Sequence, residues 1–215
     1  MTLSTKAEQI VSEINHENIK MGDIKKLAKG IKRDHDLALE LWSTGKYHPR
    51  LLSVLILDKK FLTQEMIEQF AADMLAHDPK QRNQITDWLL ANQLTKSKKT
   101  TALITTWEDH SSPVLRRLFW YHQGRLRWTG KAPPVNNSAM LLDSLENQMA
   151  NDEPEVQWAM NFCACFIGLH EPDFRARCID LGETVGLYKG DPVPRHCAPN
   201  YLPEFIQYEL DKRHK

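Results

Sequence analysis

The chain has 215 residues, of which 41% are hydrophobic and 26% are charged, with 9 Gly and 11 Pro. This composition is typical of globular proteins and excludes the collagen-like and extensively disordered classes. The 28 Lys and Arg residues balance 28 Asp and Glu residues. The chain is therefore not a uniformly basic nucleic-acid binder, and a polyanionic partner would have to be recognised by local charge.

Hydrophobic segments and cysteines indicate the compartment. No stretch approaches the ~20 apolar residues of a membrane-spanning helix, and residues 1–8 lack the apolar centre of a signal peptide. We therefore expect a cytoplasmic protein with no membrane partner. The last quarter of the chain contains all four cysteines, Cys163, Cys165, Cys178 and Cys197. Such crowding favours reduced thiols over a disulfide scaffold.

Apolar residues recur at intervals of three and four along nearly the whole chain, and strict polar–apolar alternation is scarce. This periodicity predicts an all-α protein. The expected helices span residues 5–16, 22–32, 35–44, 49–58, 64–76, 80–94, 98–107, 113–128, 138–150, 154–168, 173–185 and 200–212. Side-chain oxygens at Asp34, at Thr63 and in the segment 151–153 are expected to cap helix starts, and Pro154 fits a first turn.

Three of these helices begin alike. Pro49, Pro113 and Pro154 are each followed by apolar residues two, five and six positions later. The last two prolines are 41 residues apart, which is the length of a HEAT or armadillo unit. The pattern predicts one domain over residues 1–215, built as a curved α–α superhelix of HEAT-like repeats. An ordinary helical bundle is the alternative, because helices commonly start with proline.

The proposed repeats also align polar and aromatic positions. The fourth residue after each proline is Ser53, Arg117 or Trp158. If these helices line the inner curve of the superhelix, this column faces its groove. The groove would then present a charged group and an aromatic ring.

Local charge is uneven. Residues 111–131 carry five basic residues and no acid, whereas residues 132–174 carry seven acids and no Lys or Arg. The helix from Pro113 groups basic and aromatic side chains on one face, including Arg117, Trp120 and Arg127. Cations beside aromatic planes suit the backbone and bases of nucleic acids. The alternative is a helix that is buried on both sides.

The helix from Pro154 adds further candidates. Trp158, Asn161 and Phe162 turn away from its most apolar face. The candidate DNA-binding residues are therefore Arg117, Trp120, Arg127, Trp158 and Asn161.

The sequence lacks support for metal or cofactor chemistry. Cys163 and Cys165 are two residues apart on a predicted helix, so their sulfur atoms point in opposite directions. His196 and Cys197 could form a ligand pair or a reactive thiol, but no second pair has ligand spacing. The sequence has no Gly-rich phosphate loop, no Gly-x-Ser-x-Gly and no His-Glu-x-x-His. We expect neither a metal nor a cofactor.

Four segments, taken in order, carry a family resemblance. They are residues 36–42 (DLALELW), 113–128 (PVLRRLFWYHQGRLRW), 156–163 (VQWAMNFC) and 187–199 (LYKGDPVPRHCAP). Together they resemble the bacterial DNA alkylation repair proteins, which are HEAT-like-repeat alkylpurine DNA glycosylases. The resemblance covers most of the chain from about Gly22 onward.

The resemblance implies a C-shaped superhelix whose concave face grips the backbone of duplex DNA. It also implies removal of cationic N3- or N7-alkylpurines without base flipping. Aromatic side chains would contact the lesion sugar, and a carboxylate would stabilise the developing oxocarbenium ion. Because an alkylated base is already a good leaving group, the reaction needs mostly electrostatic help.

The presumed catalytic positions depart from the family pattern. The alignment places the family's catalytic carboxylate on Asn83 and its later groove Trp on Phe162, while its DNA-contacting Arg corresponds to Arg117. Asn83 cannot supply a negative charge. The resemblance therefore implies an impaired glycosylase unless Asp78, Asp87 or another carboxylate substitutes.

Three functions stay open at this point. The first is alkylpurine excision, and the second is binding of lesions or unusual DNA structures without catalysis. The third is a protein-interaction scaffold, whose acidic surface around residues 143–155 would meet a basic partner.

Overall fold

The structure is a computed structural model that describes residues 2–130, 132, 133 and 135–213. Within these ranges the chain forms twelve α-helices, two 3-10 helices and no strand, which confirms the predicted all-α class. No helix in the described ranges is both long and apolar enough to span a bilayer. The chain divides into two compact units, Met1–Leu115 and Arg116–Lys215. The single domain over residues 1–215 stays a prediction.

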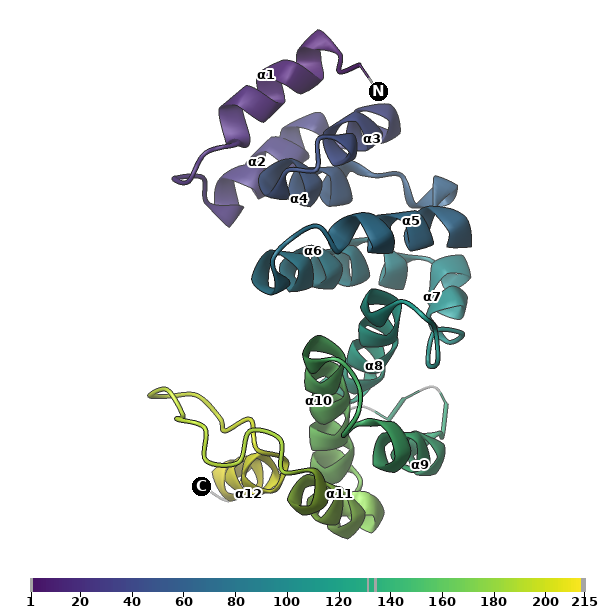
Figure 1. The fold of residues 1–215 in the computed structure, drawn as a ribbon, viewed down its shortest axis with the longest axis vertical. Coiled ribbons are helices and arrows are strands. Elements are labelled where there is room, and N and C mark those ends of the chain that lie inside the picture. The colour runs from purple at the N-terminus through teal and green to yellow at the C-terminus, as the bar shows by residue number, and fades with distance from the viewer. Residues whose placement is uncertain (1, 131, 134, 214–215) are drawn as a thin grey trace. The chain divides into compact units, whose positions relative to one another are not determined.

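The first unit consists of stacked helices (Figure 1). Helix α3 packs on α4, α4 also packs on α2 and α6, and α5 packs on α6. The two 3-10 helices, η1 and η2, connect successive layers. The bounds are α1 (Thr5–Ile14), α2 (Met21–Ile31), α3 (His35–Ser43), α4 (Tyr47–Ile56), η1 (Lys59–Phe61), α5 (Gln64–Met74), α6 (Pro79–Asn92), η2 (Leu94–Lys96) and α7 (Lys98–Ile104).

Side-chain caps define several starts in this unit. The Asp34 carboxylate accepts a hydrogen bond from the Leu37 amide at 3.2 Å, and Thr63 Oγ1 accepts one from the Met66 amide. Both predicted caps are confirmed. Helix α4 begins two residues before the predicted start, so Pro49 is its third residue.

The second unit is built around α10 (Pro154–His170), which packs on α9 (Ser138–Gln148), α11 (Pro172–Val185) and α12 (Leu202–Arg213). Helix α8 (Pro113–Trp128) leads into this unit (Figure 1). The buried side chains of α10 are almost all apolar, as expected for a helix with neighbours on several sides.

One predicted cap is wrong. Pro154 does occupy the first turn of α10, but no side chain caps that helix. Asp152 instead forms an ion pair with Arg116 at 2.7 Å and accepts a hydrogen bond from the Glu153 amide. The ion pair thus holds this carboxylate beside α8.

The column of residues following the three prolines does not form a shared open surface. Ser53 is fully buried and donates a hydrogen bond to the Ala38 carbonyl at 2.6 Å, between α3 and α4. Arg117 is 4% exposed, and only Trp158 is half-buried. The prediction that Ser53 faces a groove is wrong, because both faces of α4 are covered by other helices.

Candidate nucleic-acid interface

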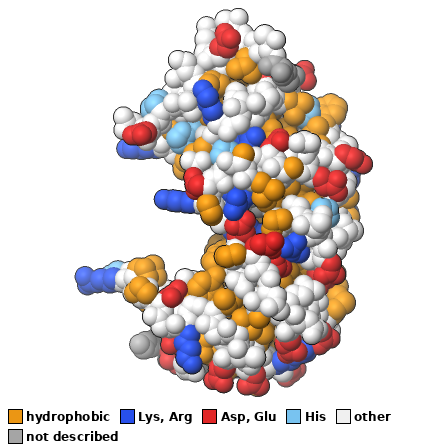
Figure 2. All heavy atoms as spheres, viewed as in Figure 1, with side chains coloured by type: hydrophobic (Ala, Val, Ile, Leu, Met, Phe, Trp, Pro, Cys, Tyr) orange, Lys and Arg blue, Asp and Glu red, His pale blue; other side chains and the backbone are white. Residues whose placement is uncertain are grey.

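A row of aromatic rings follows one face of α10. Trp158, Phe162, Phe166 and His170 occur at intervals of four, which brings side chains to the same face of a helix. The rings of Trp158 and Phe162 are 5.5 Å apart and nearly parallel, and Phe162 lies 4.8 Å from Phe166. Phe166 in turn stacks with His170 at 6.1 Å. Figure 2 shows hydrophobic side chains on the face of the second unit that carries α10.

Helix α8 contributes two more rings. Tyr121 lies 5.1 Å from Phe162 and 5.5 Å from Trp158, and Trp128 lies 6.0 Å from Phe162. We call Tyr121, Trp128, Trp158, Phe162 and Phe166 the aromatic cluster. Trp128 is 52% exposed. The cluster is therefore partly open to solvent.

Gly124 makes this arrangement of α8 and α10 feasible. A Cβ atom at this position would lie 2.4 Å from Phe162 Cδ1 and 3.2 Å from Cys163 Cα. Real Cβ atoms essentially never come within 3.0 Å of another heavy atom, so the first of these distances could not be accommodated without a shift. The absence of a side chain thus lets the Phe162 ring lie directly against α8.

Two guanidinium groups flank the cluster. Arg117 lies 4.7 Å from the centre of the Trp158 ring and 5.8 Å from that of Tyr121. Arg125 lies 5.5 Å from the Tyr121 ring and 5.9 Å from the Trp128 ring. A guanidinium within about 6 Å of a ring is attracted by the ring's negative face. Cations and rings therefore alternate along this surface.

A cavity of about 240 Å³ opens within the cluster. This volume is smaller than the roughly 300–1,000 Å³ of pockets for drug-sized ligands, so it suits a single ring system. None of the described residues that line it is charged. They are Trp128, Trp158, Asn161, Phe162, Cys165, Phe166, Ala198, Pro199, Asn200 and Phe205.

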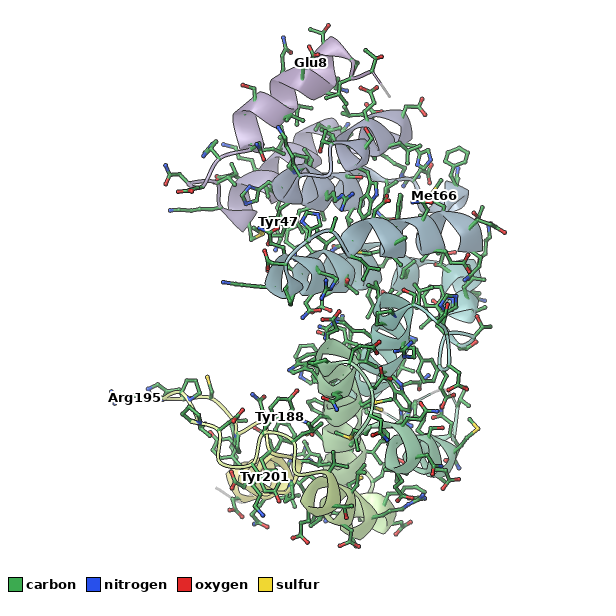
Figure 3. All side chains as sticks on the ribbon, in the orientation of Figure 1. Glu8, Tyr47, Met66, Tyr188, Arg195 and Tyr201 are labelled. Atoms are coloured by element: carbon green, nitrogen blue, oxygen red, sulfur yellow. The ribbon has the colours of Figure 1, made fainter. Side chains whose placement is uncertain are left out.

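The segment between α11 and α12, residues 186–201, closes one side of this cavity. Asn161 Nδ2 donates a hydrogen bond to the Asn200 carbonyl at 2.8 Å and so anchors the end of the segment. Tyr188 and Tyr201 lie where this segment joins the helices, and Arg195 lies at the outer end of the segment (Figure 3). Residues 189–197 of this segment are exposed.

Two of the predicted DNA-binding residues, Trp120 and Arg127, lie in the interior. Trp120 is fully buried, and Arg127 is 1% exposed. Arg127 pairs with Glu171 at 2.9 Å and donates a hydrogen bond to Ser138 Oγ at 2.8 Å, so it ties α8 to α9 and to the junction between α10 and α11. Neither residue is at the surface, so at these two positions the alternative interpretation, a buried helix face, holds.

Of the other predicted residues, Arg117, Trp158, Asn161 and Phe162 gather at the cluster. Asn161 is 5% exposed, and its amide group holds the segment 186–201. The helical wheel had placed Trp128 on this face, but sequence reasoning missed Arg125, Phe166 and Phe205 as site residues. Phe166 follows Phe162 by four residues, so helical spacing could have identified it.

Asn83, the other presumed catalytic residue, lies on α6 in the first unit. It is half-buried, and its Oδ1 atom has no hydrogen-bond partner among the described residues. Asp78 caps α6 by accepting a hydrogen bond from the Gln81 amide at 3.0 Å. The pairing of Asn83 with Phe162 in catalysis stays a prediction.

The cysteines of the described chain are free. Burial raises the pKa of Cys165 well above its ordinary value and raises the pKa of Cys178 to about 12. Both are therefore protonated and weakly nucleophilic near neutral pH. Cys197 is exposed on the segment between α11 and α12. The described residues contain no group of three or more His, Cys, Asp or Glu side chains that could hold a metal ion.

Comparison with known proteins gives one family and one solved structure. The model of a family described as "DNA alkylation repair enzyme" matches residues 12–180. No curated protein sequence matches the chain. A solved structure described as "a new family of proteins related to the HEAT-like repeat DNA glycosylases with affinity for branched DNA structures" has a TM-score of 0.68 and 18% identity. The alignment covers 98% of this chain and 89% of that one, and it confirms the HEAT-like helical fold.

Proposed function

Because the chain belongs to the DNA alkylation repair enzyme family, we propose that it binds DNA through the aromatic cluster of the second unit. The observation that carries the proposal is the alternation of guanidinium groups and rings around an uncharged cavity of about 240 Å³. The DNA would be bound where a base can leave the regular base stack, at a lesion or a branch point. The solved structure with the similar fold is described as having affinity for branched DNA, which supports this choice.

The physical basis of binding is stacking combined with charge. Base–aromatic stacking is worth about 1–3 kcal/mol per base and depends little on sequence. Trp158 and Phe162 present nearly parallel rings for such a contact. Arg125 is half-buried rather than enclosed, so its guanidinium can also meet a phosphate.

An equilibrium binding assay tests this function. Fluorescence anisotropy would compare a labelled four-way junction, a duplex and a single strand. We expect Trp158→Ala to weaken binding about tenfold, which corresponds to about 1.4 kcal/mol and lies within the range for one stacked base. Tyr208→Ala on α12 is the matched control, because Tyr208 is 41% exposed and lies outside the cluster. Equal affinity of Trp158→Ala and the native chain for all three DNAs would overturn the proposal.

Excision of cationic N3- or N7-alkylpurines is the second candidate function. The ring-lined cavity favours it, because aromatic faces attract a cationic ring. The described lining residues include no Asp or Glu, so a carboxylate for the oxocarbenium ion would have to come from outside the cavity.

A base-release assay separates excision from binding. Methylated duplex DNA would be incubated with excess protein, and free 7-methylguanine and 3-methyladenine would be measured. The second candidate predicts release faster than from DNA alone, with loss of the extra rate in Phe162→Leu. Release at the spontaneous rate would reject excision and leave DNA binding untouched.

A protein-interaction scaffold has less support. The acidic surface that suggested a basic partner is already partly neutralised within the chain. Arg177 pairs with Asp143 and Glu146, and Arg116 pairs with Asp152. A basic partner would have to displace these ion pairs.

A further inference from the structure

The first unit contains a polar cavity of about 400 Å³ that the proposed function does not use. Three segments meet there: the residues after α1, the start of α4 and the start of α6. Figure 2 shows histidine side chains gathered on this face of the first unit, and Figure 3 shows the position of Tyr47. The lining residues are Asn15, His16, Glu17, Gly45, Lys46, Tyr47, His48, His77 and Gln81.

Neighbouring groups hold the rings in this cavity. The His48 ring hydrogen-bonds the Ile14 backbone and lies 4.9 Å from the Tyr47 ring. His77 Nδ1 lies 3.0 Å from Gln81 Oε1, and because that oxygen only accepts, the imidazole donates. The cavity is therefore a set of oriented polar groups.

The charges around the cavity favour an anion. Lys46 is exposed at its edge, and His16 and His48 add positive charge when protonated, whereas Glu17 is its one acidic lining residue. Glu17 is exposed, so its charge is screened by solvent. In addition, no side chain caps the first turn of α4, whose positive end lies at Lys46.

His77 lines the cavity as a neutral ring whose one N–H is already donated to Gln81. Burial, followed by the Arg50 and Arg82 cations, lowers its pKa, although the Gln81 hydrogen bond and Asp78 oppose that effect. For His48, burial is the main cause of a lowered pKa and the nearby His16 is the next, while the Ile14 hydrogen bond opposes them. His16 also lines a neighbouring groove, together with Lys6, Glu13, Ile19, Asp23, Lys26, Leu27, Gly30 and Ile31.

We propose that this cavity binds a phosphate group, with Lys46, His16 and His48 as its cationic partners. An anion between the two imidazoles would offset their mutual repulsion and favour their protonated forms. Phosphate binding therefore takes up protons and is tighter at pH 6 than at pH 8. The same chemistry is offered by inorganic phosphate, by a terminal phosphate of DNA and by a backbone phosphodiester.

Histidine titration by NMR tests the site directly in the full chain. Ring-proton shifts of His16 and His48 would be followed against pH with inorganic phosphate, and with chloride at matched ionic strength. We expect phosphate to shift the ring protons of both residues and to raise the apparent pKa of His48 by about one unit, equivalent to about tenfold tighter binding to its protonated form. Identical titration curves in phosphate and chloride would overturn the proposal.

A pair of lysine variants localises the effect. In Lys46→Ala, the phosphate concentration that produces half of the shift should rise at least about fivefold, because a close cation is lost. Lys29→Ala is the matched control, since Lys29 is exposed on α2 and does not line the cavity. Equal responses of the two variants would assign the shifts to general screening and reject the site.

Oligonucleotides identify the source of the phosphate. A short single strand with a 5′-phosphate and the same strand without it would replace inorganic phosphate. Shifts with only the phosphorylated strand indicate a terminal phosphate, whereas shifts with both indicate the backbone. The Trp158→Ala variant should show the same shifts with inorganic phosphate, so failure of the DNA-binding proposal and failure of this one are distinguishable.

Discussion

Arg117 stacks on Trp158, with its guanidinium carbon 4.7 Å from the ring centre. The same side chain donates a hydrogen bond to the Glu155 carbonyl at 2.9 Å and is only 4% exposed. Family resemblance assigns Arg117 a direct DNA contact. The burial of Arg117 instead indicates that it holds the Trp158 ring and the start of α10 in place. Arg117 would then affect DNA binding indirectly, by positioning the Trp158 ring.

The salt dependence of DNA binding distinguishes these two roles of Arg117. The slope of log K against log[salt] is negative, and a lost phosphate contact reduces its magnitude by about one, whereas a lost positioning contact leaves it unchanged. We expect Arg117→Ala to weaken binding about fivefold to tenfold, within the range for a desolvated cation–π contact, with an unchanged slope. Anisotropy titrations at several salt concentrations measure both quantities.

Arg125→Ala is the matched control for that experiment. Arg125 is half-buried and lies over Tyr121 and Trp128. Its replacement should reduce the magnitude of the salt slope by about one, because its guanidinium can reach a phosphate. An equal reduction in the magnitude of the salt slope for Arg117→Ala would show that Arg117 itself contacts the DNA backbone.

Substitution of Gly124 should disturb the cluster without removing any ring. In Gly124→Ala the new Cβ would lie 2.4 Å from Phe162 Cδ1, so the ring or α8 must shift. We expect the free energy of unfolding to fall by about 1–3 kcal/mol, as in other overpacked cores. DNA affinity should fall as well, and urea denaturation together with anisotropy measures both effects.

Gly30→Ala provides the opposite expectation. Gly30 lies on α2, and a Cβ there would have no heavy atom within 4 Å. Alanine should therefore leave stability unchanged or raise it by up to about 1 kcal/mol, through helix propensity. A Gly124→Ala variant as stable as Gly30→Ala would contradict the close packing of Phe162 against α8.

The sequence predicted the helices well because each depends on local signals. Asp34 and Thr63 cap their helices as expected, and Pro113 begins α8 at the predicted residue. These features depend on neighbours within a few residues along the chain. The prediction of a side-chain cap at the start of α10 was wrong because Asp152 pairs with Arg116, which is distant in the sequence.

The candidate site was harder to predict because its membership depends on which helix faces are covered. The helical wheel placed Trp120 and Arg127 with Tyr121, but Ser138 on α9 and Glu171 between α10 and α11 supply the acceptors for Arg127 in the interior. Phe205 reaches the cavity from α12, far along the chain from Phe162. A wheel gives angular position on one helix, and it carries no information on which neighbours pack there.

The Arg127 network should be among the most sensitive points of the second unit. Arg127→Ala removes the cation that lies 2.9 Å from Glu171 and the donor to Ser138, and among the described residues it leaves the Glu171 carboxylate with only the hydrogen bond from the Ser138 hydroxyl. Removing one member of a buried ion pair typically costs about 3–5 kcal/mol, and because the remaining carboxylate of Glu171 is 24% exposed, this pair belongs at the lower end, about 3 kcal/mol. We expect urea denaturation to show a loss of this size.

Arg177→Ala is the comparison for the Arg127 network. Arg177 also pairs with two carboxylates, Asp143 and Glu146, but near the surface, where a third of its side chain is exposed. Exposed pairs contribute about 0–1 kcal/mol, so this variant should lose little stability. Equal losses in the two variants would contradict the structural role assigned to Arg127.

His122 should make the folded state sensitive to mild acid. It is 6% exposed on α8, and burial, followed by the charge of Arg125, lowers its pKa to about 4. In the unfolded chain a histidine titrates near pH 6.5. Between these values the unfolded state binds a proton that the folded state does not. Stability is therefore fully present above about pH 6.5 and is lost progressively as the pH falls toward 4.

The size of this effect follows from the two pKa values. Between pH 7 and pH 5 the His122 contribution to the free energy of unfolding should fall by about 2 kcal/mol. Urea denaturation at both pH values, in the native chain and in His122→Gln, isolates this contribution, because other titrating groups are common to both proteins. The variant should lose about 2 kcal/mol less than the native chain over this interval. If both proteins lose the same stability, His122 is protonated equally in the folded and unfolded states, and its burial on α8 does not exclude the charged form.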